Sequence, residues 1–411
     1  MVPKLRFKNF DGEWESKSLN DIACLTSSKR VHLSDYVKEG IPFFRGKEIT
    51  ELNNGIIPSD ILYISPSLFN DFKVKHGAPK KGEILITAVG TLGNIYHIGD
   101  LGDFYFKDGN LIWLKELKCD SLFLSFLLTL KKNEILNSAI GSTQKALTMV
   151  ELNKLVFNYP KNDEQTKVAN FISSVDEKIT LLNKQYNLLR QYKKGMMQNI
   201  FDQEVRFRDD NGDIFPAWQE NTLSNLGNVY NGLTGKTAED FGEGKFFITY
   251  KQIFDNRIIH PKGFGLVNIS KDEKQNKVKY GDLFFTTSSE TPDEVAFCSV
   301  FLETELSDCY LNSFCFGYRV NNIDKNNPVF LSFLFRSEYF RAKVKTLAQG
   351  STRYNISKAQ FMMLSVSIPV TKEQTKIGNF LTALDDKIAV KKAELDQLKT
   401  WKQGLLQQMF V

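Results

Sequence analysis

Two long segments of the chain carry apolar side chains at alternating steps of four and three residues, the spacing of one helix face. At about 1.5 Å per residue, each segment predicts a helix roughly 55–60 Å long. Because such a helix cannot bury its apolar stripe alone, we expect the two to pair as an antiparallel coiled coil. In the alternative, each helix lies on its own domain. The pairing positions are Val168, Ile172, Val175, Ile179, Leu182 and Leu189 in the first segment, and Ile377, Leu381, Leu384, Ile388, Leu395 and Leu398 in the second.

The helical segments belong to an internal repeat, because residues 141–201 align without gaps on residues 350–410. Gly141-Ser-Thr matches Gly350-Ser-Thr, and Glu164-Gln-Thr-Lys matches Glu373-Gln-Thr-Lys. Weaker matches continue upstream, so the chain is one unit of about 200 residues written twice. Asn162-x-x-Gln165 and Thr371-x-x-Gln374 have the form of a capping box, which predicts where each long helix begins.

The poorly matched middles of the two copies alternate strand and helix patterns. Residues 82–87 and 281–286 combine a glycine turn with a short apolar run, which is typical of a buried strand. The predicted fold class is therefore α+β, with two pseudo-symmetric mixed α/β domains separated by two long helices. The predicted division is a first domain at 1–160, a first helix at 161–203, a second domain at 204–369 and a second helix at 370–411.

Composition adds limits to this architecture. A net charge of +5 fits a nucleic-acid partner without establishing one. The five cysteines are odd in number and none stands in a C-x-x-C pair, which favours reduced thiols in the cytoplasm over a disulfide framework. The most apolar run, Leu122 to Leu130, is far shorter than the roughly 20 residues that cross a bilayer. These features indicate a cytoplasmic protein with no membrane partner.

The usual catalytic signatures do not appear in the sequence. Gly232-Leu-Thr-Gly-Lys-Thr237 ends like a P-loop, but Tyr230 stands where the first glycine is required. The four histidines are scattered, with no metal-ligand spacing. We expect no catalytic residue and no metal site. Two alternatives remain. The chain could be a fused DNA methyltransferase or nuclease, or it could be a coiled-coil scaffold that does not bind DNA.

The duplicated motif resembles that of a known protein family. The run from Gly141 to Leu152 continues into Pro160, Asp163-Glu-Gln-Thr-Lys-Val and Phe171, and the same pattern returns from Gly350 to Phe380. This pattern closely resembles the end of a target-recognition domain and the helix that follows it in specificity subunits of Type I restriction–modification systems. The likeness covers essentially the full chain in the family's order of domain, helix, domain, helix.

The resemblance implies a division of labour. Each domain would read one half of a bipartite sequence in double-stranded DNA, and the helices would set the spacer. Two modification subunits would dock on the chain and methylate adenine N6 with S-adenosylmethionine, and restriction (translocase) subunits using ATP and Mg could join. The chain itself would bind no cofactor and would have no active site.

Reading bases needs forked donors and amides, with lysines and hydroxyls on phosphate. The polar loops that flank the predicted strands offer such groups, although each could instead be a solvated loop or capping residue. Gln144 and Arg353 occupy the same repeat position. The copies also diverge, because Arg45-Gly46 is replaced by Thr249-Tyr250. The candidates are Arg45, Lys47, Thr87, Thr143, Gln144 and Lys145 in the first domain, and Tyr250, Lys251, Thr286, Ser288, Thr352, Arg353 and Tyr354 in the second.

Overall fold

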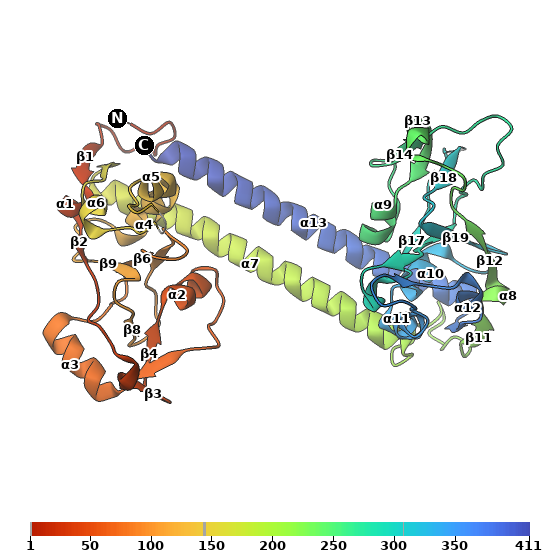
Figure 1. The fold of residues 1–411 in the computed structure, drawn as a ribbon, viewed down its shortest axis with the longest axis horizontal. Coiled ribbons are helices and arrows are strands. Elements are labelled where there is room, and N and C mark those ends of the chain that lie inside the picture. The colour runs from red at the N-terminus through yellow and green to blue at the C-terminus, as the bar shows by residue number, and fades with distance from the viewer. Residues whose placement is uncertain (1, 143–144, 307) are drawn as a thin grey trace. The chain divides into compact units, whose positions relative to one another are not determined.

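The computed structural model describes residues 2–142, 145–306 and 308–411. The chain divides into two units (Figure 1), which we call unit 1 (residues 1–183 and 393–411) and unit 2 (residues 184–392). Each long helix contributes one part to each unit. The first of them, α7, is Asn162–Phe201, and the second, α13, is Thr371–Met409. The two long helices predicted from the apolar spacing are therefore confirmed.

Unit 1 contains two four-stranded sheets and one strand pair. The first sheet has the order β2-β9-β6-β7, the second β3-β5-β4-β8, and β1 pairs with β10. The strands are β1 Glu15–Ser18, β2 Cys24–Thr26, β3 Tyr36–Val37, β4 Ile41–Phe44, β5 Leu62–Ile64, β6 Ile84–Thr87, β7 Ile95–His97, β8 Tyr105–Phe106, β9 Leu111–Lys115 and β10 Val156–Tyr159. The helices are α1 Leu19–Ile22, α2 Gly46–Asn53, α3 Pro66–His76, α4 Ser121–Leu130, α5 Lys132–Asn137 and α6 Met149–Asn153.

Unit 2 repeats this plan. Its four-stranded sheet has the order β12-β19-β15-β17, its three-stranded sheet β14-β13-β18, and the pairs are β11-β21 and β16-β20. The strands are β11 Gln219–Thr222, β12 Gly227–Asn231, β13 Phe241–Ile248, β14 Gly265–Val267, β15 Leu283–Thr286, β16 Ser288–Ser289, β17 Cys298–Val300, β18 Cys309–Leu311, β19 Cys315–Val320, β20 Tyr354–Asn355 and β21 Ser365–Ile368. The helices are α8 Leu223–Leu226, α9 Tyr250–Asp255, α10 Pro328–Leu334, α11 Glu338–Lys345 and α12 Lys358–Met362.

The sequence repeat thus corresponds to a repeat of strand pairing. The predicted strands at 82–87 and 281–286 become β6 and β15, and each pairs antiparallel on both sides, as all-buried central strands do. In unit 1, β4 pairs parallel with β8 and antiparallel with β5. In unit 2, β13 pairs in the same two ways with β18 and β14. The predicted α+β class with two similar domains is confirmed.

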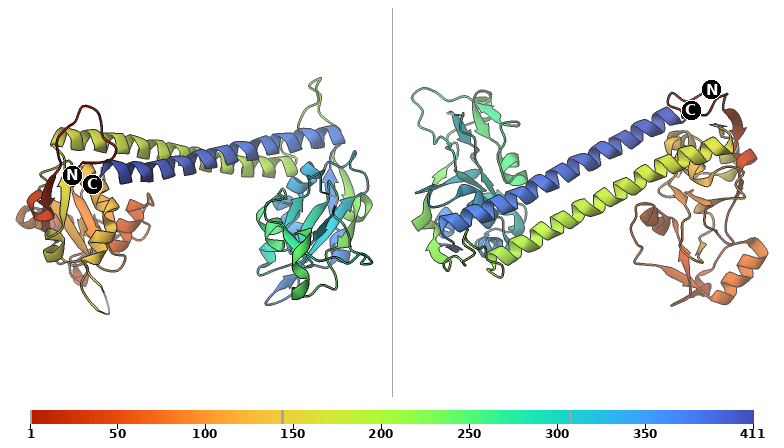
Figure 2. Two further views of the ribbon diagram at one scale, coloured as in Figure 1. Left: turned by 90° about the horizontal axis from the view of Figure 1, so that it is seen from above. Right: turned by 180° about the vertical axis from the view of Figure 1, so that it is seen from behind.

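In each unit, apolar residues of both long helices join the domain core. Figure 2 shows the ribbons of the two helices at the domain of each unit. In unit 1 the start of α7 and the end of α13 join one apolar cluster, through Val168 and Ile172 on one side and Leu405 and Met409 on the other. In unit 2 the positions on α13 are Ile377, Leu381 and Leu384, and the end of α7 adds Ile200 and Phe201. The beginning of each helix therefore packs with the end of the other, and both also pack on a domain.

The same set of polar contacts holds the start of both long helices. Arg6 pairs with buried Glu164 at 2.7 Å in unit 1, and Arg206 pairs with buried Glu373 at 2.9 Å in unit 2. The expected capping boxes do not form at the glutamines. Gln165 instead donates from Nε2 to the Pro160 carbonyl and accepts from the Asp120 N–H, and Gln374 makes the matching contacts in unit 2. These glutamines tie the start of each long helix to the end of the neighbouring strand and to the residue that caps α4 in unit 1 or α10 in unit 2.

No helix among the described residues is both long enough and apolar enough to cross a membrane.

Candidate nucleic-acid interface

Each unit presents a short hairpin whose ends are held at the end of its central strand. In unit 1, Ile140 and Ala146 exchange both backbone hydrogen bonds, at 2.9 and 2.8 Å. The Leu147 N–H then donates to the carbonyl of Ala88, the residue after β6, at 3.0 Å. The loop between Ile140 and Ala146 is therefore anchored at both ends by backbone contacts that leave its side chains free to vary.

Unit 2 repeats this arrangement at the equivalent positions. Gln349 and Asn355 exchange backbone hydrogen bonds at 3.0 and 2.8 Å, and the Ile356 N–H donates to the Thr287 carbonyl at 3.1 Å. Gly350 has φ +132°, and an added Cβ there would collide with the Arg353 carbonyl. This collision explains why the hairpin begins on glycine. We call residues 140–146 and 349–355 the reader hairpins.

In the first reader hairpin, the structure describes one of the three predicted tip residues, Lys145. Lys145 is exposed, with its chain position set by the neighbouring Ile140–Ala146 pair. Thr143 and Gln144, which sequence reasoning singled out with Lys145, lie outside the described residues. The structure therefore places one predicted side chain of this tip at the surface, and the other two stay predictions.

The predicted residues at the start of α2 line a cavity of about 590 Å³ beside the end of β6. Arg45 precedes the helix, and its guanidinium contacts the buried Glu48 carboxylate at 2.6 Å. That hydrogen bond is the main reason why the Arg45 pKa is raised. Burial acts to raise the pKa of the Glu48 carboxyl, but the hydrogen bonds from Arg45 outweigh burial and lower it. Lys47 is 61% exposed. Arg45 thus holds the helix start, and Lys47 faces outward from it.

Thr87, at the end of β6, faces inward. Its hydroxyl donates to the Thr91 carbonyl and accepts from the Asn94 N–H at 2.9 Å, and the residue is 1% exposed. Thr286 takes the same part in unit 2, where its hydroxyl accepts from the Phe297 N–H at 3.0 Å and the residue is fully buried. Both hydroxyls are engaged by the loop that follows the strand, so the geometry gives them a loop-shaping role. Their contact with DNA stays a prediction.

Unit 2 has an aromatic residue where unit 1 has glycine at the start of the helix. Thr249 caps α9 through its hydroxyl, and Tyr250 follows as the first helical residue. The Tyr250 hydroxyl donates to the Ser288 carbonyl at 2.7 Å, which ties α9 to β16. Ser288 is itself buried, whereas Lys251 is 85% exposed. Among these predicted residues, Lys251 is the exposed one, and its ammonium pairs with Asp255 at 2.7 Å one helical turn away.

The second reader hairpin ends in a polar and aromatic tip. Thr352 and Arg353 are exposed and Tyr354 is partly buried. The Arg353 guanidinium lies 6.0 Å from the ring centre of Phe314, a phenylalanine that is 58% exposed. Sequence reasoning did not find Phe314, because one phenylalanine among 33 gives no signal of exposure. The guanidinium offers paired N–H donors that suit the edge of a nucleobase. The exposed ring below it offers a flat apolar face.

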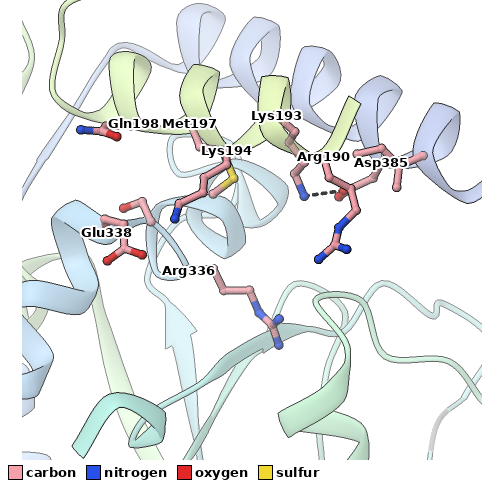
Figure 3. Close-up of a pocket in the computed structure, with 10 residues that line it drawn as sticks. Arg190, Lys193, Lys194, Met197, Gln198, Arg336, Glu338 and Asp385 are labelled. Atoms are coloured by element: carbon pink, nitrogen blue, oxygen red, sulfur yellow. Dashed lines mark hydrogen bonds and ion pairs between the residues drawn. The ribbon is translucent and has the colours of Figure 1, made fainter. Parts of the chain in front are cut away.

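The long helices carry an equivalent ion pair in each unit. Lys402 contacts Asp176 at 2.6 Å in unit 1. In unit 2, Lys193 contacts Asp385 at the edge of a cavity of about 380 Å³ that Arg190 and Lys194 also line (Figure 3). These pairs help to hold α7 against α13 in both units.

The predicted pairing positions differ in burial along each helix. Leu395 is buried at 2% exposure, as are the positions near the helix starts. The remaining positions toward the middle of the helices are only partly buried, and they are Ile179, Leu182, Leu189, Ile388 and Leu398.

Among the described residues, no three His, Cys, Asp or Glu side chains gather as a metal site. Burial raises the pKa of the Cys298 thiol to about 12, so it is protonated at neutral pH and a poor nucleophile.

Comparison with known proteins gives the family. The family model for the Type I restriction modification DNA specificity domain matches residues 11–191 and again residues 217–400. The MjaX specificity subunit of a type I restriction enzyme from Methanocaldococcus jannaschii is 24% identical, over 96% of this chain and 92% of the relative. The MjaVIII specificity subunit from the same organism is 25% identical, over 70% of this chain and 68% of the relative.

Solved structures agree on the fold. The S subunit of a type I restriction–modification system from M. genitalium superposes with a TM-score of 0.58 at 17% identity, over 100% of this chain and 99% of that one. A structure described by complex assembly and conformational transition of the type I R-M system gives a TM-score of 0.59 at 16% identity, over 97% of this chain and 98% of that one. With one family domain matched in each half, the chain belongs to the Type I restriction–modification DNA specificity family.

Proposed function

We propose that unit 1 and unit 2 each read one half of a bipartite sequence in double-stranded DNA. The observation that carries this proposal is the pair of reader hairpins. Their backbone hydrogen bonds match residue for residue, while the side chains at their tips differ. A common frame with divergent tips is what two readers of unlike half-sites require, because the groups that reach the base edges are the ones that specify the sequence.

The exposed groups of the two surfaces fit this role. Lys47 and Lys145 offer unit 1 compact charges for phosphate, and Lys251 offers the same in unit 2. Arg353 offers a fork that matches the acceptors of guanine in the major groove. Phe314 beside it offers an apolar face. The two surfaces would therefore select different bases.

The remaining roles in the proposal belong to the helices and to other subunits. The helices α7 and α13 set the spacer between half-sites, because B-DNA turns once in about 34 Å and helix length controls both distance and phase. Two modification subunits dock on the duplicated framework and methylate adenine N6 with S-adenosylmethionine, and restriction subunits bring ATP and Mg. The chain is the non-catalytic recognition subunit of this cytoplasmic complex.

A selection from random-sequence duplexes tests the reading of DNA. The full chain, purified with its modification subunits, should enrich two short conserved blocks separated by a gap of constant length. Binding should weaken steeply as salt rises, because phosphate contacts release counterions. Enrichment of a single block, or affinity that ignores salt, would contradict the proposal.

Two further experiments separate the alternatives. The chain alone, mixed with S-adenosylmethionine and the selected duplex, should transfer no methyl group, and a clear transfer would favour the fused methyltransferase. Lengthening α7 and α13 together by two helical turns should lengthen the preferred gap and leave both blocks unchanged. A change within the blocks would defeat the spacer role.

A further inference from the structure

One difference between the two units lies beside the long helices, where unit 2 holds a buried arginine that unit 1 lacks. In unit 2, Arg257 follows α9 and its side chain is only 10% exposed. Its guanidinium lies 3.7 Å from the centre of the Phe333 ring, and it donates to the Ser332 hydroxyl at 3.0 Å and to the Asp385 carboxylate at 3.2 Å. These three groups form a complete receptor for a guanidinium, with an aromatic face, a hydroxyl acceptor and a carboxylate.

Unit 1 has the same receptor without the arginine. Ser125, Phe126 and Asp176 stand at the repeat positions of Ser332, Phe333 and Asp385. All three line a cavity of about 450 Å³ in unit 1. Asn53, at the repeat position of Arg257, lines the cavity too, and its side chain is too short to occupy it.

A second arginine is also missing from this cavity. In unit 2, Arg336 donates to the backbone carbonyls of Ile253 and Asn256, which supports the segment that carries Arg257. Its repeat position in unit 1 is Thr129, another lining residue of the cavity. The space in unit 1 is therefore the volume that two arginine side chains occupy in unit 2.

The backbone explains why unit 1 leaves the space open. In unit 2, α9 ends at Asp255, and the carbonyl of Arg257 accepts from the Val300 N–H at 2.8 Å, which lays the segment along β17. In unit 1, α2 continues to Asn53 and then turns at Gly55, where φ is +72°. The longer helix and its glycine turn fold the chain back onto α2, where the Ile56 N–H donates to the Glu51 carbonyl at 2.9 Å.

The local charge suits a cation despite the lysine nearby. Lys402 neutralises Asp176, as Lys193 neutralises Asp385 in unit 2, where Arg257 is nevertheless accepted. Glu177 lines an adjoining cavity that shares Ser125, Phe126 and Asp176. In unit 2, burial lowers the pKa of Arg257, and the charges of Asp385 and of Asp386, the counterpart of Glu177, act against that shift. The other titratable groups at the site are engaged, since Lys132 donates to Asn94 at 3.0 Å and the His97 ring nitrogen lies 3.0 Å from the Ser121 hydroxyl.

The arginine must come from outside unit 1. This unit contains only three arginines, and each has an acidic partner elsewhere: Arg6 with Glu164, Arg30 with Asp108 and Arg45 with Glu48. A free guanidinium compound would bind weakly, because one partly exposed ion pair and one cation–π contact support a dissociation constant on the order of 1 mM or above. Leu181, which lines the adjoining cavity, is 62% exposed. Leu181 would give a partner an apolar contact beside the arginine receptor, and arginine is one of the residues enriched at protein interfaces.

We propose that the cavity formed by Ser125, Phe126 and Asp176 in unit 1 binds an arginine side chain of a modification subunit. The source of the arginine rests on the proposed function, whereas the chemistry of the site does not. The units then dock their partners differently: unit 1 receives an arginine, and unit 2 supplies its own at the equivalent place.

The chemistry of the site is tested on the full chain by methyl NMR, with N-acetyl-arginine methylamide as the probe. The methyl signals of Ile95, Ile179 and Leu181 should shift with a millimolar dissociation constant. The matching citrulline amide, which has the same shape and no charge, should leave them unchanged. An equal response to both probes would overturn the site, and micromolar affinity for the free amide would overturn its assignment to a protein side chain.

Two variants and one matched control sharpen this test. Asp176→Asn and Ser125→Ala should each weaken the probe at least fivefold, and Asp385→Asn in unit 2 should change nothing at these methyl groups. If Asp176→Asn fails to fold, the milder Ser125→Ala variant still decides. Binding that survives both substitutions unchanged would contradict the proposal.

The source of the arginine is tested by assembly. Asn53 lines the cavity, so Asn53→Arg should fill it in cis and weaken binding of one modification subunit about tenfold. Asn54→Arg, which adds the same charge at an exposed position that does not line the cavity, should have no effect. Normal assembly of Asn53→Arg would overturn the modification subunit as the source. If the wild-type chain binds no modification subunit at all, the proposed function fails, and the probe experiment still tests the chemistry of the site.

Discussion

In unit 1 the first reader hairpin, between Ile140 and Ala146, carries an exposed lysine, whereas in unit 2 the matching hairpin carries Arg353 over an exposed phenylalanine. Below the tips, the two hairpins are anchored by the same backbone hydrogen bonds to the residue after the central strand. The helix starts further back are held by the same arginine–glutamate pair in both units. The exposed tips and the cavity beside Asp176 are therefore two places where the units diverge on a common framework. A duplicated protein of this kind can change what it reads without altering how it folds.

The largest expected effect tests the common framework. Arg206→Ala leaves the fully buried Glu373 without its ion pair, which should cost unit 2 about 3 kcal/mol of unfolding free energy. Arg6→Ala should cost unit 1 a similar amount, because Glu164 is almost as deeply buried. Hydrogen exchange followed on peptides of each unit measures both. Arg208→Ala, which removes an exposed side chain, is the control, and a loss below about 1 kcal/mol in either unit would break the equivalence.

The next effect separates the filled receptor from the open one. Arg257→Ala removes a cation–π contact and hydrogen bonds to a carboxylate and a hydroxyl, and should destabilise unit 2 by about 2 kcal/mol. Asn53→Ala at the repeat position should stay within about 0.5 kcal/mol, because that side chain is exposed. The same exchange measurement reports both. Equal losses of stability at the two positions would show that the unit 1 cavity is occupied in the same way as the Arg257 site of unit 2.

A smaller effect is expected at the second reader hairpin. Arg353→Ala should weaken DNA binding about tenfold, or about 1.4 kcal/mol, because a good bidentate contact to a base is worth about 1–3 kcal/mol. Fluorescence anisotropy on the selected duplex measures the affinity. Arg353→Lys separates shape from charge, since lysine keeps the charge and loses the fork. Full affinity in the alanine variant would remove Arg353 from the interface.

The smallest effect concerns acid. Hydrogen bonds from Lys277 and Lys245 lower the pKa of the half-buried Asp308 carboxyl to about 2. A carboxyl whose pKa is lowered in the folded state stabilises the fold above its unfolded pKa, and this contribution is lost as pH falls from about 4 to about 2. Asp308→Asn should therefore remove part of the fall in the unit 2 unfolding midpoint over that range. Asp103→Asn, at the repeat position in unit 1, is the control, and an unchanged acid response in Asp308→Asn would contradict the assignment.

Much of this framework could be predicted from the sequence, because it depends on periodic and duplicated features. The steps of four and three around Val168 and Ile377 specify helices, and the glycine turns before β6 and β15 specify buried strands. The roles of Gln165 and Gln374 could not be predicted. Their partners, Asp120 and Asn327, are more than 40 residues away in the sequence, and no local pattern records that distance.

The reading surface was harder to predict for the same reason. A threonine at a strand end has the same sequence signature whether its hydroxyl faces solvent or, as in Thr87 and Thr286, closes a loop. The exposure of Phe314 and the open receptor at Asp176 depend on packing between distant segments. The arginine receptor becomes visible only when the two units are compared position by position.

Selection of random duplexes by the Arg353→Ala chain, in complex with its modification subunits, tests the claim of two independent readers most directly. The base preference should relax within one conserved block, while the other block and the gap between them stay as in the wild type. Relaxation of both blocks together, or of neither, would contradict a reader in each unit.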